Sequence, residues 1–274
     1  MNEMKTFVNS SLGIIDSGVG GLSVVKAVRE VFPVRNVIYV ADPANFPYGE
    51  KSKEELLILV SPIIEYLTRV ERVQALVIAC GTLSSVCFED FCKRYPIPIF
   101  DIVRPAVSEA AFVTRKKRVG VLATRTTVRS KRFARLFESL DNSITVYEEA
   151  WPDFIEEVER GAFDTPFWRK EIKTRLKRFT SLDVDTLILG CTHFALIETF
   201  FEQLLGDSSG LTLVNPARAC ALELQKALDT ESIVESNSGK SEVRCLVRGD
   251  VGHFENLLRM FVSENSCKVR AFGS

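Results

Sequence analysis

The sequence has few of the residues that mark metal-binding or disulfide-rich proteins. Its 274 residues include only 2 histidines, and none of its 7 cysteines forms a CxxC pair. A zinc site built from paired cysteines and histidines is therefore not expected. An odd number of cysteines spread over a long chain is typical of reduced thiols rather than of a disulfide framework. We expect neither a metal nor another cofactor.

The sequence also lacks a charge excess and a long apolar run. It has 35 Lys and Arg against 36 Asp and Glu, which gives a net charge of −1 and no positive field for nucleic acid or an anionic membrane. No stretch approaches the roughly 18 unbroken apolar residues of a membrane-spanning helix. The opening MNEMKTFVNSSLG has no apolar core of a signal peptide. We expect a cytoplasmic protein that binds neither nucleic acid nor a membrane.

Short apolar runs alternate with longer segments of helical period, which predicts an α/β fold with mainly parallel strands. A helix is expected over residues 53–70, with a kink at Pro62, and a loop over the polar residues 229–241. The predicted strands are 12–16, 37–41, 75–79, 97–100, 119–123, 143–147, 186–190, 211–214 and 243–247.

The two halves of the chain repeat one pattern. In the first half a strand ends at Asp16 in DSGVGG, and a second strand ends at Cys80 in ACGT, 64 residues later. In the second half a strand ends at Thr124 in ATRTT, and another ends at Cys191 in GCTH, 67 residues later. Open parallel sheets place their sites at the carboxyl ends of strands. The repeat therefore predicts two facing α/β units that close on one ligand.

Each of these cysteines is expected to open a helix, where backbone N–H groups and the helix dipole favour a thiolate. One such cysteine alone is more often a buried core residue. A cysteine hydrolase would use Cys191 with His193 and leave Cys80 without a role. Two cysteines on opposite sides of a ligand could instead move a proton from one face of a carbon to the other, without a cofactor.

The DSGVGG loop does not match a nucleotide-binding fingerprint, because Ser23 stands where the third glycine is required and a P-loop lysine is missing. Its backbone N–H groups could bind a smaller anion such as a carboxylate. A plain strand-to-helix turn explains its glycines equally well. The same is true of Pro47 and Gly49 in the loop around Tyr48.

Five segments together resemble the bacterial glutamate racemase family: DSGVGGLSV, PYGEKS, ACGTLS, GVLATRTTVRS and GCTH. They occur in order between about Gly13 and Ala227. The resemblance implies two pseudo-symmetric, three-layer α/β domains with the active site in the cleft between them, and a homodimer. We assign residues 1–101 and 212–274 to the first domain and 102–211 to the second.

The resemblance also implies an activity, the interconversion of L- and D-glutamate without a cofactor, which supplies D-glutamate for peptidoglycan and so for cell shape. By the same resemblance Cys80 and Cys191 are the acid and base thiols. Asp16 is the polar partner of the first thiol and His193 that of the second, with Glu159 near His193. The positions that correspond to substrate contacts are Asp16, Ser17, Tyr48, Gly49, Gly81, Thr82, Thr192 and His193.

Three positions depart from the family pattern. Gly81 replaces an asparagine after the first cysteine, Phe194-Ala195 replaces Tyr-Pro, and Leu83 replaces a small residue. These changes leave open a racemase for another amino acid, such as aspartate, and a paralogue that binds an amino acid or a protein without turnover. Because a glycine offers no amide to the substrate, we expect Gly81→Asn to increase activity on glutamate.

Overall fold

The computed structural model of the chain describes residues 11–206, 210–229, 242–262 and 267–273. The strands are β1 Leu12–Asp16, β2 Val37–Ala41, β3 Ala75–Ile78, β4 Ile99–Asp101, β5 Arg118–Ala123, β6 Thr145–Ala150, β7 Thr186–Leu189, β8 Thr212–Val214, β9 Val243–Val247 and β10 Cys267–Ala271.

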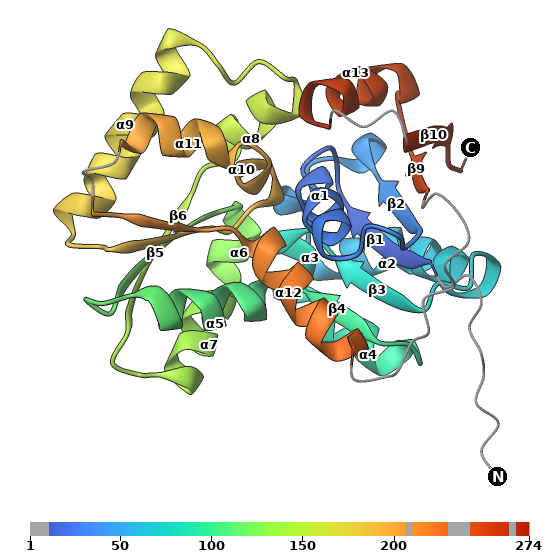
Figure 1. The fold of residues 1–274 in the computed structure, drawn as a ribbon, viewed down its shortest axis with the longest axis horizontal. Helices are drawn as coiled ribbons and strands as arrows, with labels where there is room; N and C mark the ends of the chain where they lie inside the picture. Colours follow the sequence, from blue (N-terminus) through green and yellow to red (C-terminus); the bar gives the residue numbers. More distant parts are fainter. Residues whose placement is uncertain (1–10, 207–209, 230–241, 263–266, 274) are drawn as a thin grey trace.

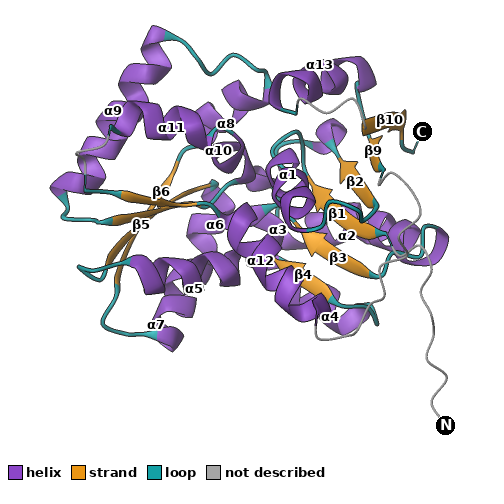
Figure 2. Cartoon of the chain, in the orientation of Figure 1, coloured by secondary structure: helices purple, strands orange, loops and turns teal. Residues whose placement is uncertain are grey.

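Along the chain, most helices connect one strand to the next, as in other parallel α/β proteins (Figure 2). They are α1 Leu22–Val31, α2 Lys53–Glu65, α3 Gly81–Val86, α4 Phe88–Arg94, α5 Val103–Val113, α6 Arg125–Ser130, α7 Arg132–Leu140, α8 Pro152–Glu159, α9 Pro166–Ser181, α10 Thr192–Leu196, α11 Glu198–Leu205, α12 Pro216–Asp229 and α13 Val251–Phe261. Two short 3₁₀ helices, η1 Pro43–Asn45 and η2 Tyr48–Glu50, precede α2, and a π-helical turn, η3 Tyr66–Val70, follows it.

The strands form two separate sheets, which Figure 1 shows side by side. The six-stranded sheet has the order β10-β9-β2-β1-β3-β4, and the four-stranded sheet has the order β6-β5-β7-β8. All pairings among the described strands are parallel. The order β2-β1-β3-β4 is repeated as β6-β5-β7-β8, so the four-stranded sheet has the topology of four strands of the larger sheet, which β9 and β10 extend. The predicted α/β fold with parallel sheets is confirmed.

Each sheet is buried on both faces. In β1, Ile14 packs into one apolar cluster with residues of α1 and α12, whereas Ile15 packs into another with residues of α2 and α4. In β5, Val121 packs toward α7, and Leu122 packs on the opposite side with residues of α8, α9 and α11. Helices on both faces of each sheet give the three-layer arrangement.

The predicted domain boundary before residue 212 is corrected by the strand pairing. β8 begins at Thr212 and pairs with β7, which places it in the four-stranded sheet, so that sheet continues to Val214. A three-residue strand carries no sequence feature that tells which sheet it joins. The rest of the proposed domain division stays a prediction.

Most predicted elements occur within two residues of their predicted bounds. Helix 53–70 is α2 followed directly by η3, and Pro62 lies inside α2. β4 begins two residues later than predicted, β6 extends to Ala150, and β10 was not predicted. The predicted loop lies, except for Asp229, outside the described residues. Among the described helices, none has the length and apolar composition to cross a membrane.

Candidate active site

The candidate site lies where the carboxyl ends of the two sheets face each other. Asp16 is the last residue of β1, and Cys80 follows β3 and directly precedes α3. Cys191 follows β7 and directly precedes α10. The short helices α3 and α6, which start at the carboxyl ends of β3 and β5, contact each other between the sheets (Figure 1). Both cysteines are buried, each with 5% of its surface exposed.

Cys191, His193 and Glu159 form a hydrogen-bonded chain. The Cys191 Sγ lies 3.6 Å from His193 Nδ1, and His193 Nε2 lies 2.6 Å from Glu159 Oε2. Burial by itself lowers the pKa of His193, but the hydrogen bonds to Cys191 and Glu159 and their negative charges outweigh it and raise this pKa well above its usual value. An imidazolium therefore persists beside the Cys191 sulfur, where it stabilises negative charge.

Cys80 has the opposite electrostatic environment. Burial raises the pKa of this thiol, and the negative charge of Asp16 raises it further, against the lowering effect of the Leu83 and Thr82 backbone N–H groups. The structure therefore favours a protonated thiol at Cys80 and a polarised sulfur at Cys191. A thiol that can donate a proton and a sulfur beside a positive charge are the two groups that proton transfer across a substrate needs.

Asp16 is completely buried beside both cysteine loops. Its Oδ2 accepts a hydrogen bond of 3.1 Å from Thr192 Oγ1, while Oδ1 makes no hydrogen bond of normal geometry with the described residues. Burial raises the pKa of Asp16 to about 6, although the positive charge of His193 and the Ser17 backbone N–H lower it. A buried carboxylate oxygen with free acceptor capacity can accept a hydrogen bond from a thiol or a substrate ammonium group.

At several glycines, a loop of the six-stranded sheet lies very close to residues of the four-stranded unit. A β-carbon at Gly18 would lie 2.4 Å from a Glu159 carboxylate oxygen, and one at Gly20 would lie 2.5 Å from Thr192 Oγ1. One at Gly49 would lie 2.7 Å from Thr124 Cβ. Because real β-carbons do not approach other atoms so closely, these positions require glycine for a close approach of the loops, which explains them better than turn geometry alone.

Several predicted substrate-contact residues lie close to the two cysteines, and the hydrogen bonds of their hydroxyl groups differ. Thr82 Oγ1 lies 2.9 Å from Thr124 Oγ1 of the opposite unit, and Ser17 is buried next to Asp16. The Tyr48 hydroxyl, however, donates a 2.7 Å hydrogen bond to Asp42 Oδ2, a residue that directly follows β2. The Tyr48 side chain is buried and packs in the same apolar cluster as Cys80.

Three groups that contact the predicted site residues were not predicted from the sequence. Thr124 bonds Thr82, the Val19 backbone N–H donates a 2.9 Å hydrogen bond to Glu159 Oε2, and the Phe46 ring lies 5.4 Å from the His193 ring. Thr124 could have been found, since it occupies the position of Asp16 in the internal repeat. A backbone N–H and a single phenylalanine carry no such signature.

The expectation that Gly81→Asn increases activity stays a prediction, although Gly81 has little room for a side chain in this structure. A β-carbon at position 81 would lie 2.6 Å from the carbonyl oxygen of Gly190, a backbone atom. An asparagine here would require one of the two contacting backbone segments to shift. Gly81 itself lies directly against the loop that carries Cys191.

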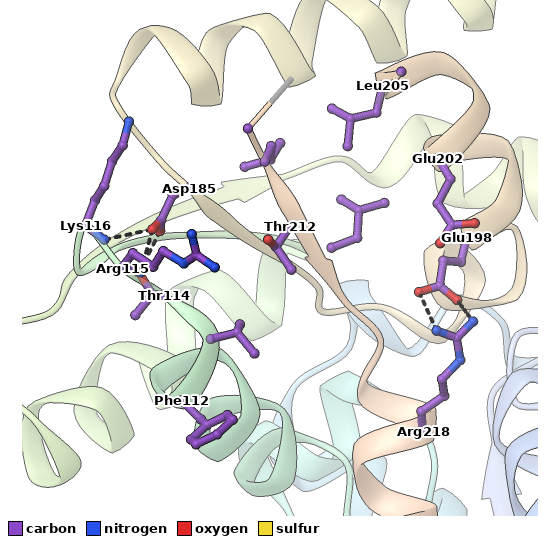
Figure 3. Close-up of a pocket in the computed structure, with 15 residues that line it drawn as sticks. Phe112, Thr114, Arg115, Lys116, Asp185, Glu198, Glu202, Leu205, Thr212 and Arg218 are labelled. Carbon is purple, nitrogen blue, oxygen red and sulfur yellow. Dashed lines mark hydrogen bonds and ion pairs between the residues drawn. The ribbon is translucent and has the colours of Figure 1, made fainter. Parts of the chain in front are cut away.

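A large cavity lies at the opposite edge of the four-stranded sheet (Figure 3). Its volume is about 1230 Å³, and its walls include Thr114–Lys116 before β5, Asp185 before β7 and the first residues of β8. Asp185 accepts hydrogen bonds from Thr114, Arg115 and Lys116, and Arg218 pairs with Glu198 across the cavity's other side. This cavity is at the amino ends of the strands, so it does not contain the cysteines.

The chain belongs to the Asp/Glu/hydantoin racemase family, whose model matches residues 13–224. The match includes both cysteines and the strands from β1 to β8, whereas β9 and β10 lie beyond it.

Its relatives are named glutamate racemases. Glutamate racemase 2 of Caldanaerobacter subterraneus is 33% identical over 94% of this chain and 95% of its own length. The crystal structure of glutamate racemase isoform RacE1 from Bacillus anthracis has a TM-score of 0.88 at 30% identity and covers 96% of this chain and 97% of its own. That of Francisella tularensis glutamate racemase, in complex with D-glutamate, has a TM-score of 0.85 at 26% identity, over 97% of this chain and 98% of its own.

Proposed function

We propose that this chain is a glutamate racemase that interconverts L- and D-glutamate by proton transfer between Cys80 and Cys191. The observation that carries the proposal is the pair of buried cysteines at the ends of β3 and β7, with opposite electrostatic surroundings. The names of the relatives supply the substrate. No step requires a cofactor or metal.

In the proposed reaction the glutamate α-carbon lies between the two sulfurs. The Cys191 thiolate removes the α-proton, so that the Cα–H bond breaks as an S–H bond forms and the electron pair passes to Cα and its carboxylate. The Cys80 thiol then donates its proton to the opposite face of Cα and becomes a thiolate. The other enantiomer of glutamate reacts in the reverse direction, starting from the Cys80 thiolate.

The neighbouring residues have separate roles in this proposal. His193, held by Glu159, stabilises the Cys191 thiolate, and Asp16 disfavours negative charge on Cys80 until the substrate's ammonium group is near. Ser17, Thr82 and Thr192 contact the substrate through hydroxyl groups, whereas Gly49 and Gly81 contribute backbone. Tyr48 donates its hydroxyl proton to Asp42 and can still accept a hydrogen bond from the substrate.

Several wider features belong to the same proposal. The protein would act in the cytoplasm as a homodimer and supply D-glutamate for peptidoglycan. These features follow from the family resemblance, and the geometry of the single chain is compatible with them.

The proposal is tested by incubating the protein with L-glutamate in D₂O and following the α-proton signal by NMR and the optical rotation by polarimetry. We expect the α-proton signal to disappear and the rotation to decay to zero, and the same for D-glutamate. L-aspartate serves as the comparison substrate. Exchange of aspartate without exchange of glutamate, or exchange of neither, would contradict the proposed function.

A further inference from the structure

Helix α9 carries a strong local excess of positive charge. Its 16 residues include six basic side chains and one acidic side chain, a net charge of +5, whereas the whole chain has a net charge of −1. Figure 1 shows α9 at the outer edge of the molecule, beside the four-stranded sheet and away from the six-stranded one. The expectation of no membrane partner rests on the charge of the whole chain, which averages over this cationic surface.

The two faces of α9 differ in character. Its buried residues, Ile172, Leu176 and Phe179, pack into the apolar cluster of the four-stranded unit. Its exposed face carries three lysines at i, i+3 and i+7, a spacing that places them next to one another along the helix. This lysine stripe consists of Lys170, Lys173 and Lys177, all of them exposed.

The arginines of α9 are paired within the protein, but the lysine stripe is not. Arg169 pairs with Asp164 at 2.5 Å. Arg175 and Arg178 both pair with Glu149. The lysines of the stripe pair with no carboxylate in the part of the chain that the structure describes. A hollow of about 420 Å³ runs along them without an acidic residue in its lining, which is formed by Pro166, Arg169, Lys170, Lys173, Thr174 and Lys177. The stripe therefore presents uncompensated positive charge to an external partner.

An exposed aromatic ring lies at the N-terminal end of the same helix. Phe167 has 61% of its surface exposed and packs edge-on against Trp168, with the ring centroids 4.9 Å apart. Exposed aromatic side chains beside lysines are typical of faces that lie on a membrane, where the ring enters the headgroup region. Sites for single-stranded nucleic acid instead interleave several rings with the cations. On α9, Phe167 is the one aromatic ring that is largely exposed.

We propose that the lysine stripe and Phe167 form a contact surface for an anionic phospholipid bilayer. Lysine suits this partner, because its ammonium group is a hydrated point charge that is attracted to a charged surface, whereas arginine is favoured for bidentate contacts with single phosphates. The protein would adsorb reversibly, without a helix that crosses the membrane. No residue of this surface belongs to the candidate active site, so the inference does not rest on the proposed function.

The test is sedimentation of the full-length protein with lipid vesicles at low salt. Vesicles of phosphatidylglycerol are compared with vesicles of neutral phosphatidylcholine. We expect binding to the anionic vesicles only, and release at about 0.5 M salt, because salt screens the attraction. No binding to the anionic vesicles, or equal binding to both kinds, would overturn the inference.

The first variant replaces the whole stripe, with Lys170→Gln, Lys173→Gln and Lys177→Gln. Glutamine has a helix propensity similar to that of lysine, so α9 should be retained. Each lysine near an anionic surface contributes about fivefold to the binding constant, so binding to phosphatidylglycerol vesicles should fall about 100-fold. Racemisation should remain at the wild-type rate, which also shows that the variant is folded.

The matched control removes three positive charges elsewhere, from the exposed residues of α1, α4 and β10 that are changed by Lys26→Gln, Lys93→Gln and Lys268→Gln. Because these charges lie on other surfaces, binding should stay within about threefold of the wild type. An equal loss in both triple variants would show that the net charge matters and not the stripe, and would overturn the inference.

A second variant, Phe167→Ala, keeps every charge and should weaken vesicle binding several-fold, since a ring that enters the headgroup region is lost. Single-stranded DNA is the comparison ligand: binding to DNA that depends on the stripe, without binding to vesicles, would assign the stripe to nucleic acid and overturn the inference. If the wild type binds anionic vesicles but does not racemise glutamate, the membrane surface stands and the proposed function fails.

Discussion

Glu159 Oε2 accepts two hydrogen bonds, one from His193 within its own unit and one from the Val19 backbone N–H across the cleft. The residue is buried although it ends α8, a helix whose neighbouring residues Glu156 and Glu157 pair with Arg160. A carboxylate in this position both keeps His193 charged and connects the loop after β1 to the second unit.

We predict that Glu159→Gln lowers kcat/KM by about 10- to 100-fold and moves the alkaline limb of its pH profile to lower pH. A raised pKa keeps His193 charged as the pH rises, and this charge is lost when the pH passes the pKa. Removing the negative charge of Glu159 lowers the pKa of His193, so the loss comes earlier. The measurement is kcat/KM between pH 6 and 10.

Glu156→Gln is the matched control for that prediction, since Glu156 lies in the same helix, is partly exposed and pairs with Arg160 rather than with His193. Its pH profile should equal that of the wild type. An unshifted alkaline limb in Glu159→Gln would show that Glu159 does not act on His193 as described.

The buried charge of Asp16 is expected to lower the stability of the folded protein. Because the folded state raises the pKa of Asp16 from 3.8 to about 6, the ionised carboxylate costs the folded state free energy at pH 7, by about 3 kcal/mol. Asp16→Asn removes the charge and should raise the free energy of unfolding at pH 7 by up to this amount, while lowering racemisation.

The gain from Asp16→Asn should depend on pH in a defined way. The cost appears as the pH rises from about 4 to 6, so wild type and variant should converge in stability below about pH 4. Urea unfolding at pH 4 and pH 7 measures both values. An Asp16→Asn variant that is less stable at pH 7 would contradict the burial argument.

For single residues, the sequence indicated which titratable side chains come together, but not which atoms each residue contacts. Asp16, Cys80, Cys191 and His193 lie together because strand ends of parallel sheets meet at one edge. What Gly81 touches depends on how two separate sheets approach each other, which no local pattern encodes.

Among the elements, α2 has the clearest local determinants. Ser52 Oγ accepts a 3.2 Å hydrogen bond from the Glu55 N–H, and the Glu55 side chain accepts one of 2.8 Å from the Ser52 N–H. This capping box begins the helix where the sequence predicted it. Leu56, Val60 and Ile63 then bury one face against the six-stranded sheet.

We predict that Ser52→Ala lowers the free energy of unfolding by about 1 kcal/mol, because the Glu55 N–H loses its acceptor at the start of the helix. The activity should not change, since α2 contributes no residue to the site. Ser181→Ala is the control: Ser181 is exposed, and its hydroxyl donates a hydrogen bond to the Lys177 carbonyl at the end of α9 and caps no helix N-terminus. A loss in Ser52→Ala no larger than in Ser181→Ala would contradict the capping assignment.

Strands were predicted well where they are central and less well at edges. β1, β2 and β9 have the predicted bounds, and every residue of β1 and β2 is buried. β10 alternates partly buried and exposed residues, and β6 carries Glu148 and Glu149, so neither forms a continuous apolar run. In the predicted strand 97–100, Pro98 has no N–H for the ladder, and β4 starts after it.

The whole molecule is two copies of one strand order with their carboxyl ends opposed. The repeat of Asp16 and Cys80 as Thr124 and Cys191 predicted this arrangement, and the shared order β2-β1-β3-β4 and β6-β5-β7-β8 agrees with it. One apolar cluster, which includes residues of α5 and α12, contacts both sheets.

Because the two sheets have opposed carboxyl ends, we expect each cysteine to act on one face of the substrate. A variant with a single cysteine should therefore retain chemistry on one face only. Since general acid or base groups contribute about 10²- to 10⁴-fold, racemisation should fall by at least this factor in Cys80→Ser and in Cys191→Ser.

The most direct test follows the α-proton of each glutamate enantiomer separately in D₂O with these two variants. We predict that neither variant interconverts the enantiomers, and that each exchanges the α-proton of a different enantiomer, the one whose proton faces the remaining cysteine. Racemisation near the wild-type rate in either variant, or exchange of the same enantiomer by both, would contradict the assignment of Cys80 and Cys191 to opposite faces.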